Sequence, residues 1–140
     1  MKSEIFLDAS YGIALSISSD EHHETAKELA LQLKKDRTRM VTTKAIVFEL
    51  GNSLSASRLR QIGVKLIDAL SNDPDVEVIP ITNDLYEKAI ELFRSRGDKQ
   101  WGLTDCYSFI VMQERGLTEA LTADIHFKQA GFRRLLINND

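Results

Sequence analysis

The sequence has 140 residues, of which 43% are hydrophobic, and its formal net charge at pH 7 is -3. This length and apolar content suffice for a compact core, so we expect one domain over residues 1–140. The single cysteine excludes an internal disulfide, and no Cys/His cluster has the spacing of a zinc site. The small acidic excess excludes the broad basic surface of many nucleic-acid-binding proteins.

No stretch approaches the ~20 apolar residues that a membrane-spanning helix needs. The first apolar run, "EIFL", is too short for the core of a signal peptide. We therefore expect a soluble, cytoplasmic protein that does not act at a membrane.

In the first half of the chain, short apolar runs alternate with longer amphipathic segments. The runs "EIFL" (4–7) and "RMVT" (39–42) have the length and composition of strands. Apolar residues at helical spacing predict helices at 19–35, from near Thr43 through Leu54, and at 59–70. This alternation is typical of an α/β fold built on a mostly parallel sheet.

The second half of the chain continues the alternation. The expected elements are a strand at 76–81, a helix opened by Thr82 or Asn83, an apolar helix from Thr104 to Gly116, a strand at 119–124, a short helix at 125–132 and a last strand at 134–138. We expect Thr104 to be the N-cap of the apolar helix, and Tyr86 and Phe93 to face the core from the helix before it.

Acidic residues occupy matching places in this pattern. Asp8 and Asp124 directly follow predicted strands, and the carboxyl ends of strands are where ligands bind in open α/β sheets. Asp105 begins the apolar helix, where the free N–H groups of the first turn favour a carboxylate. Glu49 sits inside the apolar run "AIVFEL", where an uncompensated charge costs several kcal/mol.

If these four acids converge, a cation has to compensate them. Two charges about 5 Å apart repel by roughly 3 kcal/mol at an effective dielectric constant near 20. An all-carboxylate site fits a hard ion, Mg²⁺ or Mn²⁺. Each acid also has an ordinary explanation: Asp8 and Asp105 can be helix caps, and Glu49 can pair with Lys44. The hypothesis therefore depends on all four acids together.

Four segments that contain these acids occur in a fixed order: "FLDAS", "FEL", "LTDCYSF" and "TADIHFKQAGF". They resemble the acidic motifs of PIN-domain ribonucleases, and especially of the small toxins of VapBC-type toxin-antitoxin pairs. The resemblance covers nearly the whole chain. It implies a three-layer α/β/α fold with a short central sheet, and a metal-dependent endonuclease that hydrolyses phosphodiester bonds of single-stranded or structured RNA.

Carried onto this chain, the resemblance makes Asp8, Glu49, Asp105 and Asp124 the catalytic acids. It implies that Asp8, Asp105 and Asp124 hold Mg²⁺ or Mn²⁺, and that Glu49 orients or deprotonates the attacking water. One metal ion and two both remain possible.

The resemblance also implies supporting groups and partners. Ser10 and Thr104 stand where the family often has a hydroxyl that orients an acid. Apart from the resemblance, His126 stands two residues after Asp124, and we expect it to support the site or to cap a helix and not to be the general acid. Toxins of this family usually form homodimers and are inhibited by a small antitoxin protein whose C-terminal segment enters the active-site groove.

The RNA backbone needs cations near the acids. The candidates for substrate binding are Arg58, Arg60, Arg96 and Lys99, together with Trp101, whose ring could stack on an unpaired base. Their ordinary alternatives are solvated surface charge and a tryptophan that packs its loop.

Two other families of α/β proteins with acidic sites fit this sequence less well. A haloacid-dehalogenase-type phosphatase needs a second Asp two residues after the first, where Ser10 stands. A response-regulator receiver needs adjacent acids after its first strand and an Asp after a middle strand, which "LDAS" and "IPITND" do not both supply. The remaining alternative is a non-catalytic PIN-like module that binds RNA or protein, and the presence of all four acids argues against it.

Overall fold

The computed structural model describes residues 4–138 and 140. In chain order its elements are β1 (Glu4–Leu7), α1 (Ala9–Ser16), α2 (His23–Asp36), β2 (Arg39–Thr43), α3 (Lys44–Ser53), α4 (Arg60–Asn72), β3 (Val76–Ile79), α5 (Asn83–Ser95), α6 (Leu103–Arg115), β4 (Glu119–Leu121), α7 (Ile125–Gln129) and β5 (Arg133–Arg134). Strands and helices alternate much as the apolar pattern predicts, except that α1 was not predicted and the helix expected at 19–35 begins only at His23.

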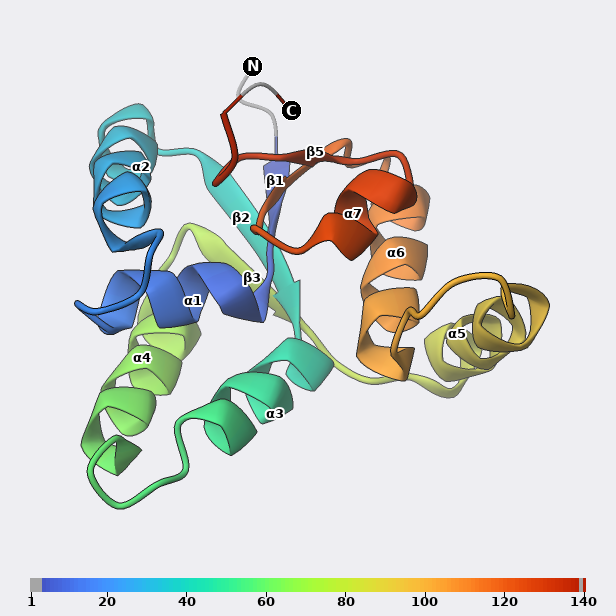
Figure 1. Cartoon of the computed structure of the whole chain (residues 1–140), viewed down its shortest axis with the longest axis horizontal. Coiled ribbons are helices and arrows are strands. Elements are labelled where there is room, and N and C mark those ends of the chain that lie inside the picture. Colours follow the sequence, from blue (N-terminus) through green and yellow to red (C-terminus); the bar gives the residue numbers. More distant parts are fainter. Residues whose placement is uncertain (1–3, 139) are drawn as a thin grey trace.

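The central sheet has the strand order β3-β2-β1-β4-β5, and every neighbouring pair is parallel. Figure 1 shows α1, α2 and α4 on one side of this sheet, and α5, α6 and α7 on the other. The helix α3 lies beyond the carboxyl ends of the strands and contacts α1, α4 and α6. The predicted three-layer α/β/α fold with a short parallel sheet is confirmed.

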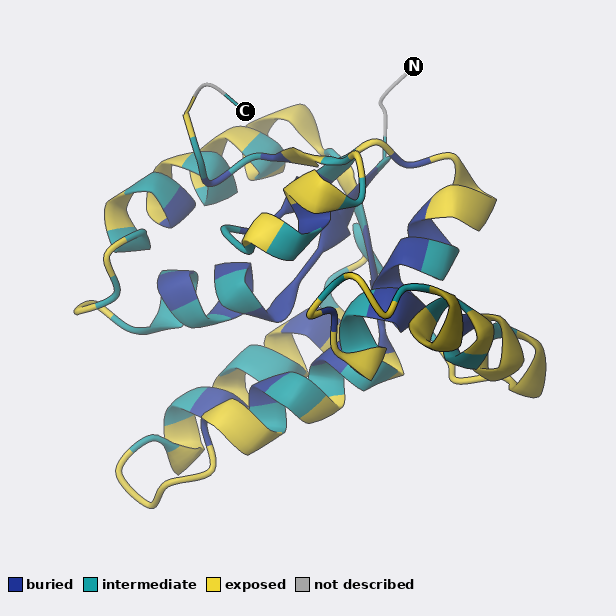
Figure 2. Ribbon diagram, turned by 45° about the vertical axis from the view of Figure 1, so that its right-hand side comes forward, coloured by how far each residue is buried: buried dark blue, intermediate teal, exposed yellow. Residues whose placement is uncertain are grey.

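The core lies along the inner strands and the helix α6 (Figure 2). Phe6 of β1 and Leu121 of β4 are fully buried, as is Met112 of α6. Strands that are covered on both faces need continuous apolar runs, and this explains why "EIFL" shows no polar alternation. The apolar middle of α6 is buried for the same reason, as the sequence predicts.

Threonine side chains start two of the helices. Thr43 Oγ1 accepts a hydrogen bond from the backbone N–H of Ile46 at 3.1 Å, and Thr82 Oγ1 accepts one from Leu85 at 3.2 Å. Both caps agree with the sequence analysis. The helix α6 ends at Gly116, whose φ of 67° lies in the left-handed region that favours glycine. Among residues 4–138 and 140, no helix combines the length and apolar character needed to cross a membrane.

Three local predictions were wrong. The N-cap of α6 is Gly102, two residues before Thr104, because the Asp105 carboxylate reaches back to accept the Gly102 N–H at 3.1 Å. The last strand spans only Arg133–Arg134 and turns follow it, so a strand at 134–138 is not formed. Tyr86 and Phe93 do not face the core, since their exposed fractions are 46% and 50%.

Candidate active site

Asp8 is fixed by two hydroxyl groups at the end of β1. The register pairs Leu7 with Leu121, which sets Asp8 beside Thr122 at the end of β4. Thr122 Oγ1 donates to Asp8 Oδ2 at 2.7 Å, and Ser10 Oγ donates to the same oxygen at 2.9 Å. Asp8 is only 5% exposed, and its carboxyl group cannot turn away without breaking these bonds.

The same hydroxyls hold the segment that leads to Asp124. Ser10 Oγ accepts the N–H of Ala123 at 3.2 Å, and Thr122 Oγ1 accepts the N–H of Asp124 at 3.0 Å. The ends of β1 and β4 are therefore locked together, and Asp8 and Asp124 are held at the same edge of the sheet. Burial raises the pKa of Asp8 above its usual range, the hydroxyl hydrogen bonds oppose this, and the charge of Asp124 adds to it.

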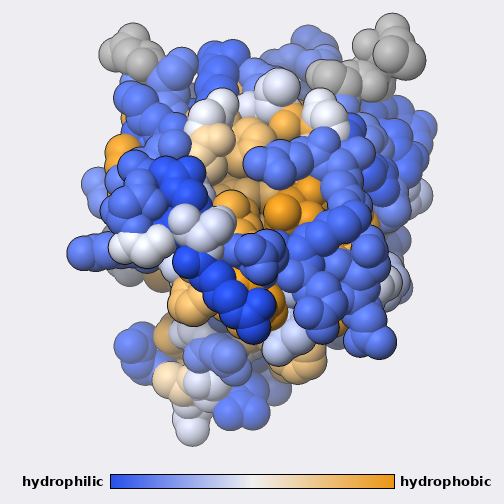
Figure 3. Space-filling view, turned by 90° about the vertical axis from the view of Figure 1, so that its right-hand side faces the viewer, coloured by the Kyte–Doolittle hydropathy of each residue, from blue (hydrophilic) through white to orange (hydrophobic). Residues whose placement is uncertain are grey.

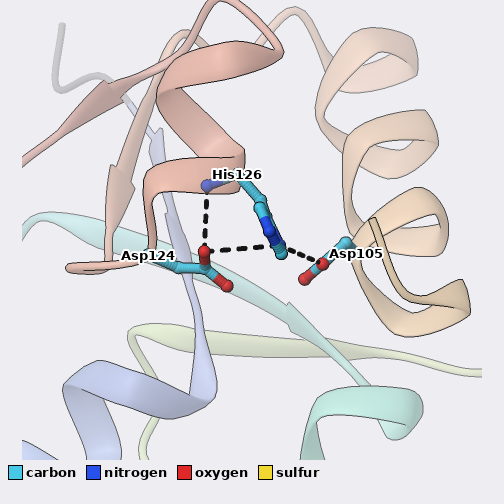
Figure 4. A group of neighbouring side chains, drawn as sticks. All are labelled: Asp105, Asp124 and His126. Carbon is cyan, nitrogen blue, oxygen red and sulfur yellow. Dashed lines mark hydrogen bonds and ion pairs between the residues drawn. The ribbon is translucent and has the colours of Figure 1, made fainter. Parts of the chain in front are cut away.

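Asp105 and Asp124 meet around His126 (Figure 4). His126 lies in the first turn of α7, where its N–H donates to Asp124 Oδ1 at 2.9 Å. Its ring Nδ1 is 2.8 Å from Asp105 Oδ2 and 3.5 Å from Asp124 Oδ1. Burial raises the pKa of Asp105, the hydrogen bond from His126 lowers it, and the charge of Asp124 raises it further.

Glu49 joins this group from α3. Its neighbours Ile46 and Leu50 are buried, while the Glu49 side chain is only partly covered at the margin of the core. Burial is the main cause that raises the pKa of Glu49 to about 7, and the charges of Asp8, Asp105 and Asp124 add to it. Four acids from distant segments thus influence one another electrostatically; together they are called the acidic cluster below.

The acidic cluster has the chemistry of a divalent cation site. Three of the four acids have raised pKa values, so the ionised cluster is unstable without positive charge. Carboxylate oxygens are the ligands that Mg²⁺ and Mn²⁺ accept. One ligand atom each from Asp105, Asp124 and His126 lie within 4.8 Å of one another, and Asp8 is outside this tightest group. The residues present therefore fit a metal ion, and the tightest group contains His126 beside two of the three predicted metal ligands.

The two predicted supporting hydroxyls differ in their surroundings. Ser10 contacts Asp8 directly, as described above. Thr104 lies in the first turn of α6 and is not the cap of that helix. The sequence analysis assigned no contact to Thr122 and only a general supporting role to His126. Thr122 bonds to Asp8, which is 114 residues away along the chain, and His126 bridges two acids. The only sequence signal for either was its place in the segment "TADIHF", next to Asp124.

The predicted substrate-binding residues are more dispersed. Trp101 is only 6% exposed, its ring packs edge-on against Phe109 at 5.0 Å, and its Nε1 donates to Gln129. These contacts match the ordinary alternative, a tryptophan that packs its loop, and stacking on an RNA base stays a prediction. Arg96 lies over the Trp101 ring at 4.9 Å and pairs with Asp98.

The other basic candidates lie in connecting segments. Arg58 and Arg60 belong to the connection between α3 and α4 and to the start of α4, a part of the molecule that projects away from α7 (Figure 1). Arg60 donates two hydrogen bonds to the Ser55 carbonyl. Lys99 lies in the connection before α6. RNA contacts by these cations stay predictions.

A separate cavity of about 580 Å³ lies among α1, α2, α4 and the strands β2 and β3. Its lining is mostly apolar and includes Tyr11, Leu33, Met40 and Leu66. None of the predicted site residues lines this cavity.

Comparisons with known proteins agree with this geometry. The family model described as "PIN domain" matches residues 5–133. The chain is 30% identical over 128 residues to the 23S rRNA-specific endonuclease VapC20 of Mycobacterium tuberculosis, and the match covers 91% of this chain and 95% of that protein.

The fold of this chain is also similar to solved structures of VapC20 and of two further proteins. The crystal structure of Mycobacterium tuberculosis VapC20, described as a sarcin-ricin loop cleaving toxin, matches with a TM-score of 0.80 and 28% identity over 91% of this chain and 95% of that one. VapBC2 from Rickettsia felis has a TM-score of 0.67 at 15% identity, and FitAcB from Neisseria gonorrhoeae 0.62 at 17% identity; they cover 94% and 93% of this chain, and 97% and 95% of theirs. These two likenesses concern the fold alone. The resemblance seen in the acidic motifs is confirmed, and the chain belongs to the PIN domain family.

Proposed function

We propose that this protein is a Mg²⁺- or Mn²⁺-dependent endoribonuclease and the toxin of a toxin-antitoxin pair. The observation that carries the proposal is the convergence of Asp8, Glu49, Asp105 and Asp124 at the carboxyl edge of the sheet. Membership of the PIN domain family and the likeness to an endonuclease toxin support it. A purely structural role does not explain why four partly or fully buried acids lie close enough to influence one another electrostatically.

The residues of the acidic cluster have different roles in the proposed reaction. Asp105 and Asp124 hold the metal ion, and Asp8 completes the negative site from its fixed position beside Ser10 and Thr122. When bound, the ion supplies positive charge that polarises the phosphodiester and favours ionisation of water. Glu49 lies close to the other three acids and accepts a proton from the attacking water.

The similarity to VapC20 suggests a first substrate. That protein is named as specific for 23S rRNA and described as cleaving the sarcin-ricin loop. We propose a structured ribosomal RNA loop as the RNA to test first, next to an unstructured single strand as the comparison.

The decisive experiment compares RNA cleavage by the parent protein with cleavage by Asp8→Asn. Asn keeps an oxygen that can accept the hydrogen bonds from Ser10 and Thr122, so the substitution removes mainly the negative charge of Asp8, and it should lower the rate by about 100-fold or more. EDTA should abolish cleavage by the parent protein. Asp68→Asn serves as the matched control, because Asp68 is an exposed acid on α4, and its activity should stay at the parent level.

Two outcomes contradict the proposal in different ways. Equal cutting by the parent protein and Asp8→Asn would identify a contaminating nuclease. RNA binding without any metal-dependent cleavage would favour the non-catalytic PIN-like module instead.

Exposed apolar side chains on one face of the molecule support two protein partners. We propose that a small antitoxin binds this protein and that two copies form a homodimer. Apolar side chains remain exposed on and near α5, at Ile81, Tyr86 and Phe93, and at Leu103, the first residue of α6. Figure 3 shows an apolar area bordered by hydrophilic residues on the face that carries these helices. Copurification with a small protein encoded next to this one tests the first partner, and the mass in solution tests the second.

A further inference from the structure

The ring of His126 lies between Asp105 and Asp124, the two acids proposed to hold the metal ion. Its Nδ1 is 2.8 Å from Asp105 Oδ2 and 3.5 Å from Asp124 Oδ1, so one nitrogen contacts acids from two different elements. The side chains of His126, Asp105 and Asp124 are 25%, 17% and 33% exposed. All three side chains are therefore partly accessible to solvent.

These spacings match those between neighbouring ligands of a metal ion. Around a six-coordinate ion with bonds of about 2.1 Å, adjacent ligands lie about 3.0 Å apart. The two N···O distances at His126 bracket this value. The backbone of His126 is itself fixed, because its N–H donates to Asp124 Oδ1 at 2.9 Å. The His126 ring can therefore contact a metal ion between the two acids while α7 keeps its position.

We propose that His126 is a nitrogen ligand of the catalytic metal and that it makes the site prefer Mn²⁺ to Mg²⁺. The inference rests on the proposed function and names the ion preference of that site. Mg²⁺ strongly favours oxygen ligands and retains its water, whereas first-row transition ions accept imidazole nitrogen. Coordination through Nδ1 uses the neutral ring with its proton on Nε2, so it replaces the hydrogen bond to Asp105.

The alternative role of His126 is that of a hydrogen-bond donor that only orients Asp105. The two roles predict different effects of His126→Asn. A donor that orients Asp105 affects both ions alike, because both need the Asp105 carboxylate. A nitrogen ligand affects Mn²⁺ far more than Mg²⁺. Titration calorimetry with each ion on tag-free protein should therefore show Mn²⁺ affinity falling roughly 10-fold or more, and Mg²⁺ affinity falling by less than about 3-fold.

A spectroscopic measurement on the parent protein tests the proposal without relying on the stability of a variant. Pulsed electron paramagnetic resonance of bound Mn²⁺ should show coupling to a ¹⁴N nucleus, and this coupling should change to that of ¹⁵N after labelling of the histidines. His22→Asn is the matched control. Its ring is also 25% exposed and lies near an acid, Glu21, but outside the acidic cluster, so the nitrogen coupling should persist.

Absence of nitrogen coupling in the Mn²⁺-loaded parent protein would overturn the inference, as would equal losses of affinity for both ions in His126→Asn. Persistence of the coupling in His126→Asn would also overturn it. RNA cleavage separates this failure from that of the proposed function. Cleavage with Mg²⁺ in a protein that shows no nitrogen coupling removes only the role of His126, whereas absence of both metal binding and cleavage removes both.

Discussion

Glu49 is the residue at which the electrostatics of the site is most directly measurable. Its carboxyl group lies near three other acids, and its pKa of about 7 is far above the usual value of 4.5. An acid whose pKa is raised by folding binds its proton more tightly in the folded state. Its contribution to stability is present below pH 4.5, is lost as the pH rises from 4.5 to 7, and does not change further above 7.

We expect Glu49→Gln to stabilise the metal-free protein at pH 8 and to have little effect at pH 4.5. Glutamine resembles the protonated glutamate in shape but never carries the charge. The full shift from 4.5 to about 7 sets the upper limit of the effect, and partial solvent screening reduces it to about 1–2 kcal/mol. Urea unfolding in EDTA at both pH values measures this. A Glu49→Gln protein that is no more stable than the parent at pH 8 would contradict the proposed charge crowding.

Some positions in the site could be predicted from the sequence, and others depend on long-range packing. The positions of Asp8 and Asp124 were predictable because acids that follow buried strands within a few residues lie at a defined edge of a parallel sheet. The contact between Thr122 and Asp8 was not, because it depends on the register that pairs Leu7 with Leu121. The position of the His126 ring depends on how α7 packs beside α6, and no local pattern determines that.

At the scale of elements, the short strand β5 holds the turn that carries Asp124. Arg134 Nη1 donates to the carbonyl of Ala123 at 3.0 Å, and its Nε and Nη2 both bind the Asp140 carboxylate at 2.9 Å. Arg134 is only 8% exposed. Together with Ser10, which accepts the N–H of Ala123, this guanidinium fixes both sides of one peptide segment in the site.

We expect Arg134→Met to destabilise the protein by about 1–3 kcal/mol, because the mostly buried carbonyl and carboxylate partners lose a charged donor. The neighbouring Arg133→Met is the matched control. Arg133 has an exposed side chain with one ion pair to Glu119, so its loss should cost less than about 1 kcal/mol. Urea unfolding compares the two variants. Equal effects of both substitutions would mean that Arg134 does not brace the turn.

The elements themselves were largely predictable, and the errors have local causes. Thr104 was assigned as the N-cap because threonine is a common N-cap and stands directly before Asp105 and the apolar run, but the Asp105 carboxylate accepts the Gly102 N–H and α6 starts at Leu103. Tyr86 and Phe93 lie at helical spacing on α5, yet remain exposed. Periodicity identifies an apolar face without saying whether this chain or a partner covers it.

At the scale of the whole molecule, the parallel topology explains why the acidic cluster exists. Parallel strands end at one edge, and the order β3-β2-β1-β4-β5 places β1 next to both β2 and β4 at the centre. Asp8 follows β1, Glu49 lies on the helix after β2, and Asp124 follows β4. The α/β class and this edge could be predicted from the alternation of elements. The strand order could not, because it is determined by long-range packing.

A fold that gathers like charges at one edge should gain stability when a cation neutralises them. We expect Mn²⁺ to raise the melting temperature of the parent protein, because an ion that binds only the folded state stabilises it by mass action. At a concentration 100 times the dissociation constant the gain is about 2.7 kcal/mol, or roughly 5–10 °C for a chain of this size. Scanning calorimetry at constant ionic strength measures the shift. Asp105→Asn should abolish most of it, and Asp68→Asn should retain it, since Asp68 is an exposed acid on α4. A midpoint that stays constant up to millimolar Mn²⁺ in the parent protein would show that the acids are compensated without a metal ion.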